Sequence, residues 1–186
     1  MNDHFQEEVV TRRNRTGETL IYVLANIIMV LAGIYAIFMI NLLISVISNN
    51  GFSPQMIIEI LLVILMAAIA VVLFLYRDRI RTEYEYTFTN GIMDFAQVFN
   101  NRKRKALGSM NVRNIEACGM VSSGAFHRYL SLPDLKKRNW FLNRDSELFF
   151  FYFTKDGTKS LMILEPSEEM ISLIKRYVGA GKFQTN

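Results

Sequence analysis

The sequence predicts an α+β protein that is anchored in a membrane. Of its 186 residues, 51% are hydrophobic, and residues 20–76 contain only one of the 38 charged side chains. In residues 77–186 the pattern changes to alternating polar and apolar residues, which is typical of half-buried β-strands. The chain therefore divides into a tail over residues 1–19, a transmembrane helical hairpin over residues 20–76 and a polar domain over residues 77–186.

Two apolar segments are long enough to cross a bilayer as helices. The first, residues 20–47, would span about 42 Å at ~1.5 Å per residue, against ~30 Å of hydrocarbon. The second, residues 56–76, follows Ser53 and Pro54, two residue types that favour the start of a helix. The short segment between them carries no charge and predicts a turn, so the helices should form an antiparallel hairpin.

Positive charges flank this hairpin on its two outer sides and are absent from its turn. The flanking residues are Arg12, Arg13, Arg15, Arg77, Arg79 and Arg81. Because Lys and Arg are retained on the cytoplasmic side, we expect a multi-pass protein of the inner (cytoplasmic) membrane with both termini, including the tail, in the cytoplasm. A cleaved signal peptide is the alternative, but its apolar region has only about 7–15 residues.

Small residues predict how the two helices pack, because they allow close approach in lipid. An intramolecular seam is expected rather than a dimer face. Its residues are Ala25, Met29, Ala32 and Ala36 on the first helix and Val63, Ala67, Ala70 and Phe74 on the second.

Glu59 is the single ionisable side chain of the hairpin, and such a residue is a functional candidate. It lies about 7.5 Å along the helix from Pro54, close to the headgroups. Asn41 has a comparable depth on the first helix, so we expect Asn41 and Glu59 to form a structural polar pair or to lie at the interface. An ion or proton pathway is the alternative, although two helices with one carboxylate form neither a pore nor a relay.

Tight turns organise the strands of the polar domain. Tyr84, Tyr86 and Phe88 alternate with polar residues and lead into Asn90-Gly91, a strong signal for a β-hairpin. A second strand covers residues 92–99. A second hairpin is expected around Asp156-Gly157, with strands over residues 147–154 and 159–164. Further short strands are expected over residues 106–110 and 112–121, whereas residues 122–146 are expected to be irregular.

An amphipathic helix closes the chain. Ser167 is a good N-cap, and Glu168 and Glu169 suit the positive end of the helix dipole. Its apolar stripe, which must pack against another element, is Met170, Ile171, Leu173, Ile174, Tyr177 and Val178. We therefore expect six or seven antiparallel strands followed by one helix that covers an open end or face of a bent sheet.

Three features together support a resemblance to a known family. They are the two-helix hairpin, the strand and turn Tyr84-Glu85-Tyr86-Thr87-Phe88-Thr89-Asn90-Gly91, and the helix start Leu164-Glu165-Pro166-Ser167-Glu168-Glu169-Met170. In this order of parts, residues 20–178 resemble small bacterial membrane proteins with a cytoplasmic pleckstrin-homology-like (PH-like) domain. The resemblance implies a seven-stranded bent antiparallel sheet or barrel capped by the C-terminal helix, in a family whose biochemistry is largely unassigned.

No group of residues forms a recognisable catalytic or metal-binding motif. The two histidines, His4 and His127, are not at metal-ligand spacing with Cys, Asp or Glu, and a structural zinc site needs about four ligands. Cys118 lies in an expected strand with no base nearby, which favours a buried inert thiol. We therefore expect no enzymatic activity, no metal and no cofactor.

The charge of the polar domain is the remaining functional signal, since residues 77–186 contain 18 Lys and Arg against 12 Asp and Glu. An anchored domain faces an anionic lipid surface, which favours lipid over nucleic acid as the partner of its cations. Solvated turns are the alternative reading of these clusters. The candidate lipid-binding residues are Arg102, Lys103, Arg104 and Lys105, and Lys136, Lys137, Arg138 and Trp140.

These observations favour a non-catalytic, membrane-anchored binding or scaffolding module that contacts anionic lipid headgroups. One alternative is an accessory or regulatory subunit of a larger membrane enzyme or transporter, whose partner would be another membrane protein. Another alternative is a minor lipid-handling activity.

Overall fold

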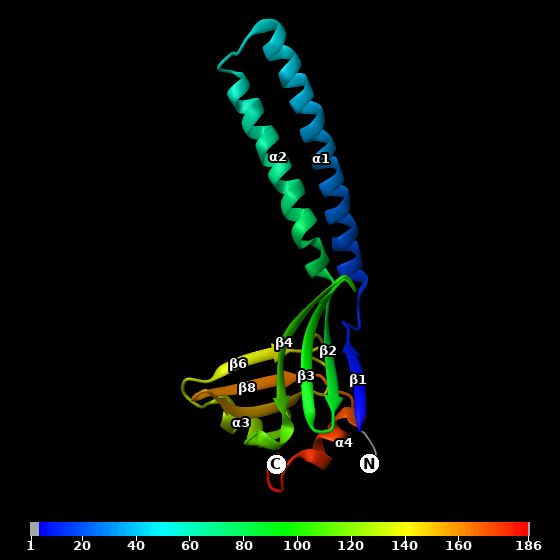
Figure 1. Cartoon of the computed structure of the whole chain (residues 1–186), viewed down its shortest axis with the longest axis vertical. Coiled ribbons are helices and arrows are strands. Elements are labelled where there is room, and N and C mark those ends of the chain that lie inside the picture. Colours follow the sequence, from blue (N-terminus) through cyan, green and yellow to red (C-terminus); the bar gives the residue numbers. More distant parts are fainter. Residues whose placement is uncertain (1–3, 186) are drawn as a thin grey trace. The chain divides into compact units, whose positions relative to one another are not determined.

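The computed structural model describes residues 4–185 and divides the chain into two compact units. One unit is residues 14–81. The other combines the segment through Arg13 with the chain from Thr82 onward. The first unit is therefore an insertion between two segments of the second, and Figure 1 shows its two helices and the strands and helices of the other unit.

The inserted unit is a helical hairpin. It contains α1 (Thr16–Asn50), α2 (Met56–Tyr76) and the short 3₁₀ helix η1 (Arg77–Ile80). Both helices are long and apolar enough to cross a membrane, which agrees with the expected membrane anchor. The second helix has the expected bounds, whereas the first extends beyond residues 20–47 at both ends and stops at Gly51, whose φ is +78°.

The seam between α1 and α2 contains the expected small residues. Ala25, Ala32 and Ala36 are buried on α1 together with one larger residue, Leu43, and Val63 is buried on α2. The expectation for Phe74 is wrong, because this side chain is 61% exposed and its ring lies 5.6 Å from the guanidinium of Arg77 instead. Contact between the helices thus relies mainly on small side chains, which allow close packing in lipid.

The first sheet contains four antiparallel strands in the order β1-β2-β3-β4. They are β1 (Phe5–Val10), β2 (Thr82–Thr89), β3 (Ile92–Phe99) and β4 (Lys103–Asn111). Residues 1–19 are expected as a tail outside the polar domain, but β1 belongs to that domain, because it pairs with β2 from Phe5↔Thr89 to Val10↔Tyr84. Only Val10 of this strand is buried, so the sequence alone carried little signal for it.

The second sheet has the order β6-β8-β7-β5-β9, and two of its four pairings are parallel. Its strands are β5 (Ala117–Met120), β6 (Lys136–Trp140), β7 (Phe149–Lys155), β8 (Thr158–Leu164) and β9 (Phe183–Gln184). The expected irregular region 122–146 contains α3 (Gly124–Leu130) as well as β6. The expectation of six or seven antiparallel strands is therefore wrong, because β1, β6 and β9 are added at sheet edges by pairing with distant segments.

The aromatic run at the start of β7 is divided between two cores. Phe149 and Phe151 are buried between the two sheets, together with residues of the C-terminal helix. Phe150 and Tyr152 point to the opposite face, where α3 covers them. Alternation along the strand explains why five consecutive aromatic residues are tolerated, since both faces of this sheet are covered.

The C-terminal helix α4 (Glu168–Tyr177) covers one end of the domain, as expected. The Ser167 hydroxyl accepts a hydrogen bond from the Met170 N–H at 3.2 Å, which confirms the predicted N-cap. At the other end of the helix, the Tyr177 ring packs edge-on against Phe88 at 5.3 Å and lies against Gly91. This contact places α4 beside the β2–β3 turn (Figure 1).

The two sheets do not close into a barrel. The register between β3 and β4 shifts after the pair Ala96↔Ala106, so Leu107 is an extra residue, and Gly108 has a φ of +149°. A bulge of this kind bends an edge strand and interrupts its hydrogen-bonding pattern. Both β4 and β6 remain edge strands. Of the two expected arrangements, a bent sheet or a closed barrel, the closed barrel is therefore wrong.

Candidate functional site

The first basic cluster, Arg102–Lys105, surrounds the turn between β3 and β4. Asn100 and Asn101 both have positive φ, at 49° and 54°, and the Arg102 N–H donates to the Phe99 carbonyl at 3.0 Å. Two successive positive φ values are typical of the type I′ turns that join antiparallel strands. All four basic residues of the cluster are exposed.

Strand register locates this cluster at one end of the first sheet. Thr82, the first residue of β2, pairs with Phe99, which also pairs with Lys103. The cluster therefore lies at the end of the sheet where β1 ends and β2 begins, and where the chain continues into residues 14–81. Arg104 forms an ion pair with Glu85 at 2.7 Å, whereas its three neighbours have no ion pair within the described part of the chain.

The residues of the second basic cluster differ in exposure along β6. Lys136 and Lys137 are exposed, whereas Arg138 and Trp140 are half-buried. Arg138 and Trp140 are two residues apart on the strand, so they share the face that is turned toward the first sheet. Only the two lysines thus resemble the surface patch that the sequence suggested.

A pocket of about 260 Å³ separates part of β4 from the second sheet. Its apolar walls are formed by Phe95, Leu107, Met110, Ile115, Trp140, Phe153 and Met162. Its polar groups come from Ser109, Asn111, Asn114, Arg138, Thr154 and Lys155. The lining includes two cations and no carboxylate, so the pocket has a positive charge.

Trp140 joins the two sheets at the inner wall of this pocket. Its ring packs against Phe95 with 5.1 Å between ring centroids, and its carbonyl accepts a hydrogen bond from the Tyr86 hydroxyl. Burial raises the pKa of Tyr86 well above its ordinary value, so this hydroxyl stays protonated and remains a donor. These contacts fix the position of Trp140, and Arg138 lies 5.8 Å from its ring centroid.

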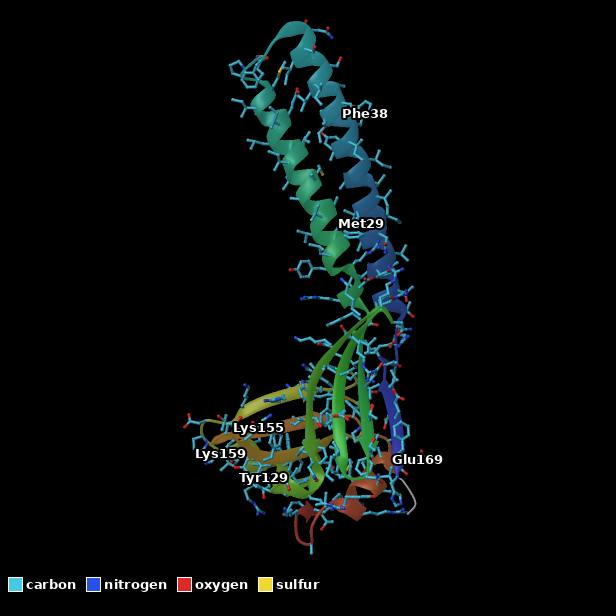
Figure 2. The ribbon with its side chains drawn as sticks, viewed as in Figure 1. Met29, Phe38, Tyr129, Lys155, Lys159 and Glu169 are labelled. Carbon is cyan, nitrogen blue, oxygen red and sulfur yellow. The ribbon has the colours of Figure 1, made fainter. Side chains whose placement is uncertain are left out.

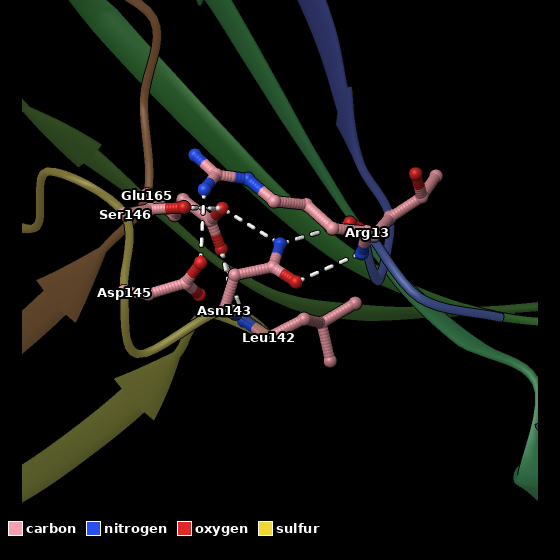
Figure 3. A network of polar contacts seen from close by, with 7 residues as sticks. Arg13, Leu142, Asn143, Asp145, Ser146 and Glu165 are labelled. Carbon is pink, nitrogen blue, oxygen red and sulfur yellow. Dashed lines mark hydrogen bonds and ion pairs between the residues drawn. The ribbon is translucent and has the colours of Figure 1, made fainter. Parts of the chain in front are cut away.

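A polar network around Glu165 fixes the segment that follows β1 (Figure 3). The Glu165 carboxylate accepts hydrogen bonds from the Asn143 N–H at 3.0 Å, the Asn143 amide at 2.7 Å and the Ser146 hydroxyl at 2.6 Å. The Asn143 amide also donates to the Thr11 carbonyl, and its oxygen accepts from the Arg13 N–H. Glu165 thus positions the last residues before the inserted hairpin.

Polar side chains of the hairpin bond locally. The Asn41 amide donates to the Ile37 carbonyl of its own helix at 2.7 Å, and Glu59 is exposed. The expected pairing of Asn41 with Glu59 is therefore not observed in the described residues. At the other end, Arg77 donates to the Asn26 side chain, and the Arg81 guanidinium lies 4.4 Å from the Tyr22 ring centroid.

Comparison with known proteins gives a family over almost the whole chain. Residues 2–183 match the family described as "Bacterial PH-like domain (DUF6106)". The chain belongs to this family. No curated protein and no solved structure matches it.

Membership of this family agrees with the expected PH-like domain, and PH-like domains are typically non-catalytic. Burial raises the pKa of the Cys118 thiol to about 12, which disfavours the thiolate that a nucleophile requires. The His4 ring is 2.9 Å from the Tyr177 hydroxyl, and His127 packs edge-on against Phe126. In residues 4–185, no three His, Cys, Asp or Glu side chains converge on a possible metal position.

Local sequence patterns do not indicate several important residues of the PH-like domain. The sequence indicates Glu165 only as part of the helix start, and it predicts no role for Asn143. Asn143 bonds to Thr11 and Arg13, which lie more than a hundred residues earlier in the chain, so no local pattern could indicate this contact. The pocket was missed for the same reason, because its walls come from distant strands.

Proposed function

We propose that this PH-like protein is a non-catalytic, membrane-anchored binding module that contacts anionic lipid headgroups through Arg102–Lys105. The observation that carries the proposal is the strand register. This register aligns the cluster with Thr82, and Thr82 follows directly on residue 81 of the hairpin unit.

Charge supports a lipid partner for this cluster. Arg102, Lys103 and Lys105 are exposed and have no ion pair in the described part of the chain. Each Lys or Arg close to an anionic membrane surface contributes roughly 1 kcal/mol. The domain also has an excess of basic residues, so an anionic surface attracts the whole domain as well as this cluster.

We also propose a multi-pass arrangement in the inner membrane with both termini in the cytoplasm. The described ends of α1 and α2 that lie away from the turn carry basic and aromatic contacts, including Arg81 on Tyr22 and Arg79 on Tyr76 at 4.7 Å. Such residues are enriched at membrane interfaces, and arginine favours the cytoplasmic side.

Cysteine labelling tests this orientation. An Asn50→Cys variant should react with an impermeant maleimide added outside intact cells, whereas a reporter fused after residue 186 should be active in the cytoplasm. Native Cys118 is fully buried and gives a low background. Reaction of the new cysteine only after permeabilisation would reverse the orientation.

Hydrogen exchange of the full chain in nanodiscs tests the lipid contact. The amides of the β3–β4 turn should exchange more slowly in anionic than in neutral nanodiscs. The difference should shrink as salt is added, because the screening length is only ~8 Å at physiological ionic strength. Replacing Arg102, Lys103, Arg104 and Lys105 by Gln should remove it, whereas replacing Lys136 and Lys137 by Gln should not.

Equal exchange in anionic and neutral nanodiscs at low salt would contradict the lipid contact. Stoichiometric co-purification of a second membrane protein would then support the role of an accessory or regulatory subunit. Full-length protein is needed for both measurements, because a fragment that starts at residue 77 lacks β1 and its pairing with β2.

A further inference from the structure

We propose that the pocket between β4 and the second sheet binds a small amphipathic carboxylate, of which a medium-chain fatty acid is the simplest form. This site is separate from Arg102–Lys105, none of which lines the pocket. The pocket combines an apolar interior with cations, a combination that suits an acidic group on a hydrocarbon chain.

Arg138 provides the most specific evidence for the acidic group. Its Nε atom is buried and has no hydrogen-bond partner among the described residues. An unsatisfied buried donor is costly, and one on a charged group is more costly still. A guanidinium presents its N–H groups in a planar fork that matches a carboxylate, so a bound carboxylate would satisfy this orphaned donor.

Other residues of the pocket agree with this ligand. Lys155 is exposed at the outer end of β7, where it can attract an anion toward the pocket (Figure 2). Phe153 and Met162 provide apolar surface beside Arg138 for a hydrocarbon chain. The lining has no Asp or Glu, so nothing in it repels an anion or already neutralises Arg138.

Size limits the ligand to a small molecule. The volume of about 260 Å³ is just below the lower end of the range of ~300–1,000 Å³ that is common for ligand pockets. Leu107 and Gly108 of the β4 bulge line the pocket, and β4 and β6 are edge strands of different sheets. A whole phospholipid would not fit, whereas a single short acyl chain with its carboxylate would.

Trp140 is the single tryptophan of the chain and lines the pocket, so its fluorescence reports on binding. We would titrate octanoate into the full chain in nanodiscs and use the neutral octanamide as the matched ligand. Octanoate should give a saturable change, and octanamide should bind at least about ten-fold more weakly, because a charge-assisted hydrogen bond is lost.

Variants separate the pocket from nonspecific uptake into the bilayer. Arg138→Gln should weaken octanoate binding about ten-fold or more, since the charged donor is removed. Arg128→Gln, at an exposed position on α3, should leave it unchanged. If Arg138→Gln unfolds the domain, Lys155→Gln replaces it, because Lys155 is exposed and its substitution should weaken binding without affecting the fold.

Three results would overturn the proposal: no saturable change with octanoate, equal affinity for octanamide, or folded Arg138→Gln and Lys155→Gln variants that both bind octanoate as well as the original protein does. Failure here leaves the headgroup contact of Arg102–Lys105 intact, because hydrogen exchange of the β3–β4 turn measures that contact separately.

Discussion

The hairpin unit and the PH-like domain bury different kinds of side chain. In the hairpin, a narrow row of mostly small residues is buried, while large apolar residues such as Phe38 and Ile58 are 63% and 75% exposed. In the domain, large aromatic residues such as Phe88 and Phe151 are completely buried. The difference shows that lipid can solvate apolar side chains that water cannot, so only the domain needs a large core.

The two units also differ in how far apart in the sequence their side-chain hydrogen bonds reach. Asn26, Asn41 and Asn49 of the hairpin each donate to the carbonyl four residues earlier on their own helix. In the domain, Asn143 and Glu165 instead join segments that are distant in the sequence. These asparagines of the hairpin therefore bond within one helix, whereas Asn143 and Glu165 connect distant segments of the domain.

The largest expected effect is on stability, and it compares a buried aromatic residue of the domain with an exposed one of the hairpin. Phe151→Ala should destabilise the domain by about 3–5 kcal/mol, because a buried aromatic ring is replaced by a cavity. Phe38→Ala should change the unfolding of the domain by less than about 0.5 kcal/mol, as for other exposed positions. Urea unfolding of the full chain, followed by Trp140 fluorescence, measures both, and equal effects would contradict the comparison.

A smaller effect uses the same substitution at two glycines. Gly91 has a φ of +95°, and a Cβ built there would lie 2.7 Å from the Tyr177 ring. Gly91→Ala should therefore cost roughly 1–2 kcal/mol. A Cβ at Gly33 meets nothing within 4 Å, and alanine favours helix, so Gly33→Ala should not destabilise α1.

Thermal unfolding followed by circular dichroism checks this pair. Gly179→Ala is the matched control inside the domain, because a Cβ there makes only ordinary contacts at 3.6 Å. Gly181 is unsuitable as a control, since its φ is +80° and it precedes β9. Equal melting temperatures for Gly91→Ala and Gly179→Ala would argue against the contact between the β2–β3 turn and Tyr177.

The smallest effect concerns a half-buried carboxylate of the domain. Burial raises the pKa of Glu8 above its ordinary value, even though its carboxylate accepts a hydrogen bond from the Ser167 N–H at 3.0 Å. A carboxyl group with a raised pKa favours the folded state when it is protonated. This contribution is fully present below the unfolded pKa and is lost as the pH rises through the folded pKa.

Glu8→Gln should therefore raise the melting temperature at pH 7 and make no difference at a pH well below the ordinary pKa of Glu8. Melting curves at the two pH values measure this. Glu59→Gln, in the hairpin unit, serves as the control and should leave the domain transition unchanged at both. A lower melting temperature of Glu8→Gln at pH 7 would show that the hydrogen bond to Ser167 outweighs the cost of burial.

Much of this protein follows from local sequence patterns. The two apolar helices, the Asn90-Gly91 and Asp156-Gly157 turns and the Ser167 N-cap are all present where the sequence predicts them. Each depends on residues within a few positions of one another, or on the length of an apolar run, so the information is contained in one segment.

Only the tertiary structure decided which segments pair at the sheet edges and what they enclose. The segment around Val10 becomes β1 because β2 offers it an edge, and Lys136–Trp140 becomes β6 because β8 does. Alternation along β6 then divides one basic run, leaving Lys137 on the surface while Arg138 lines the pocket. Pairing of distant strands follows from packing and hydrogen bonding across the whole domain, which a single segment does not encode.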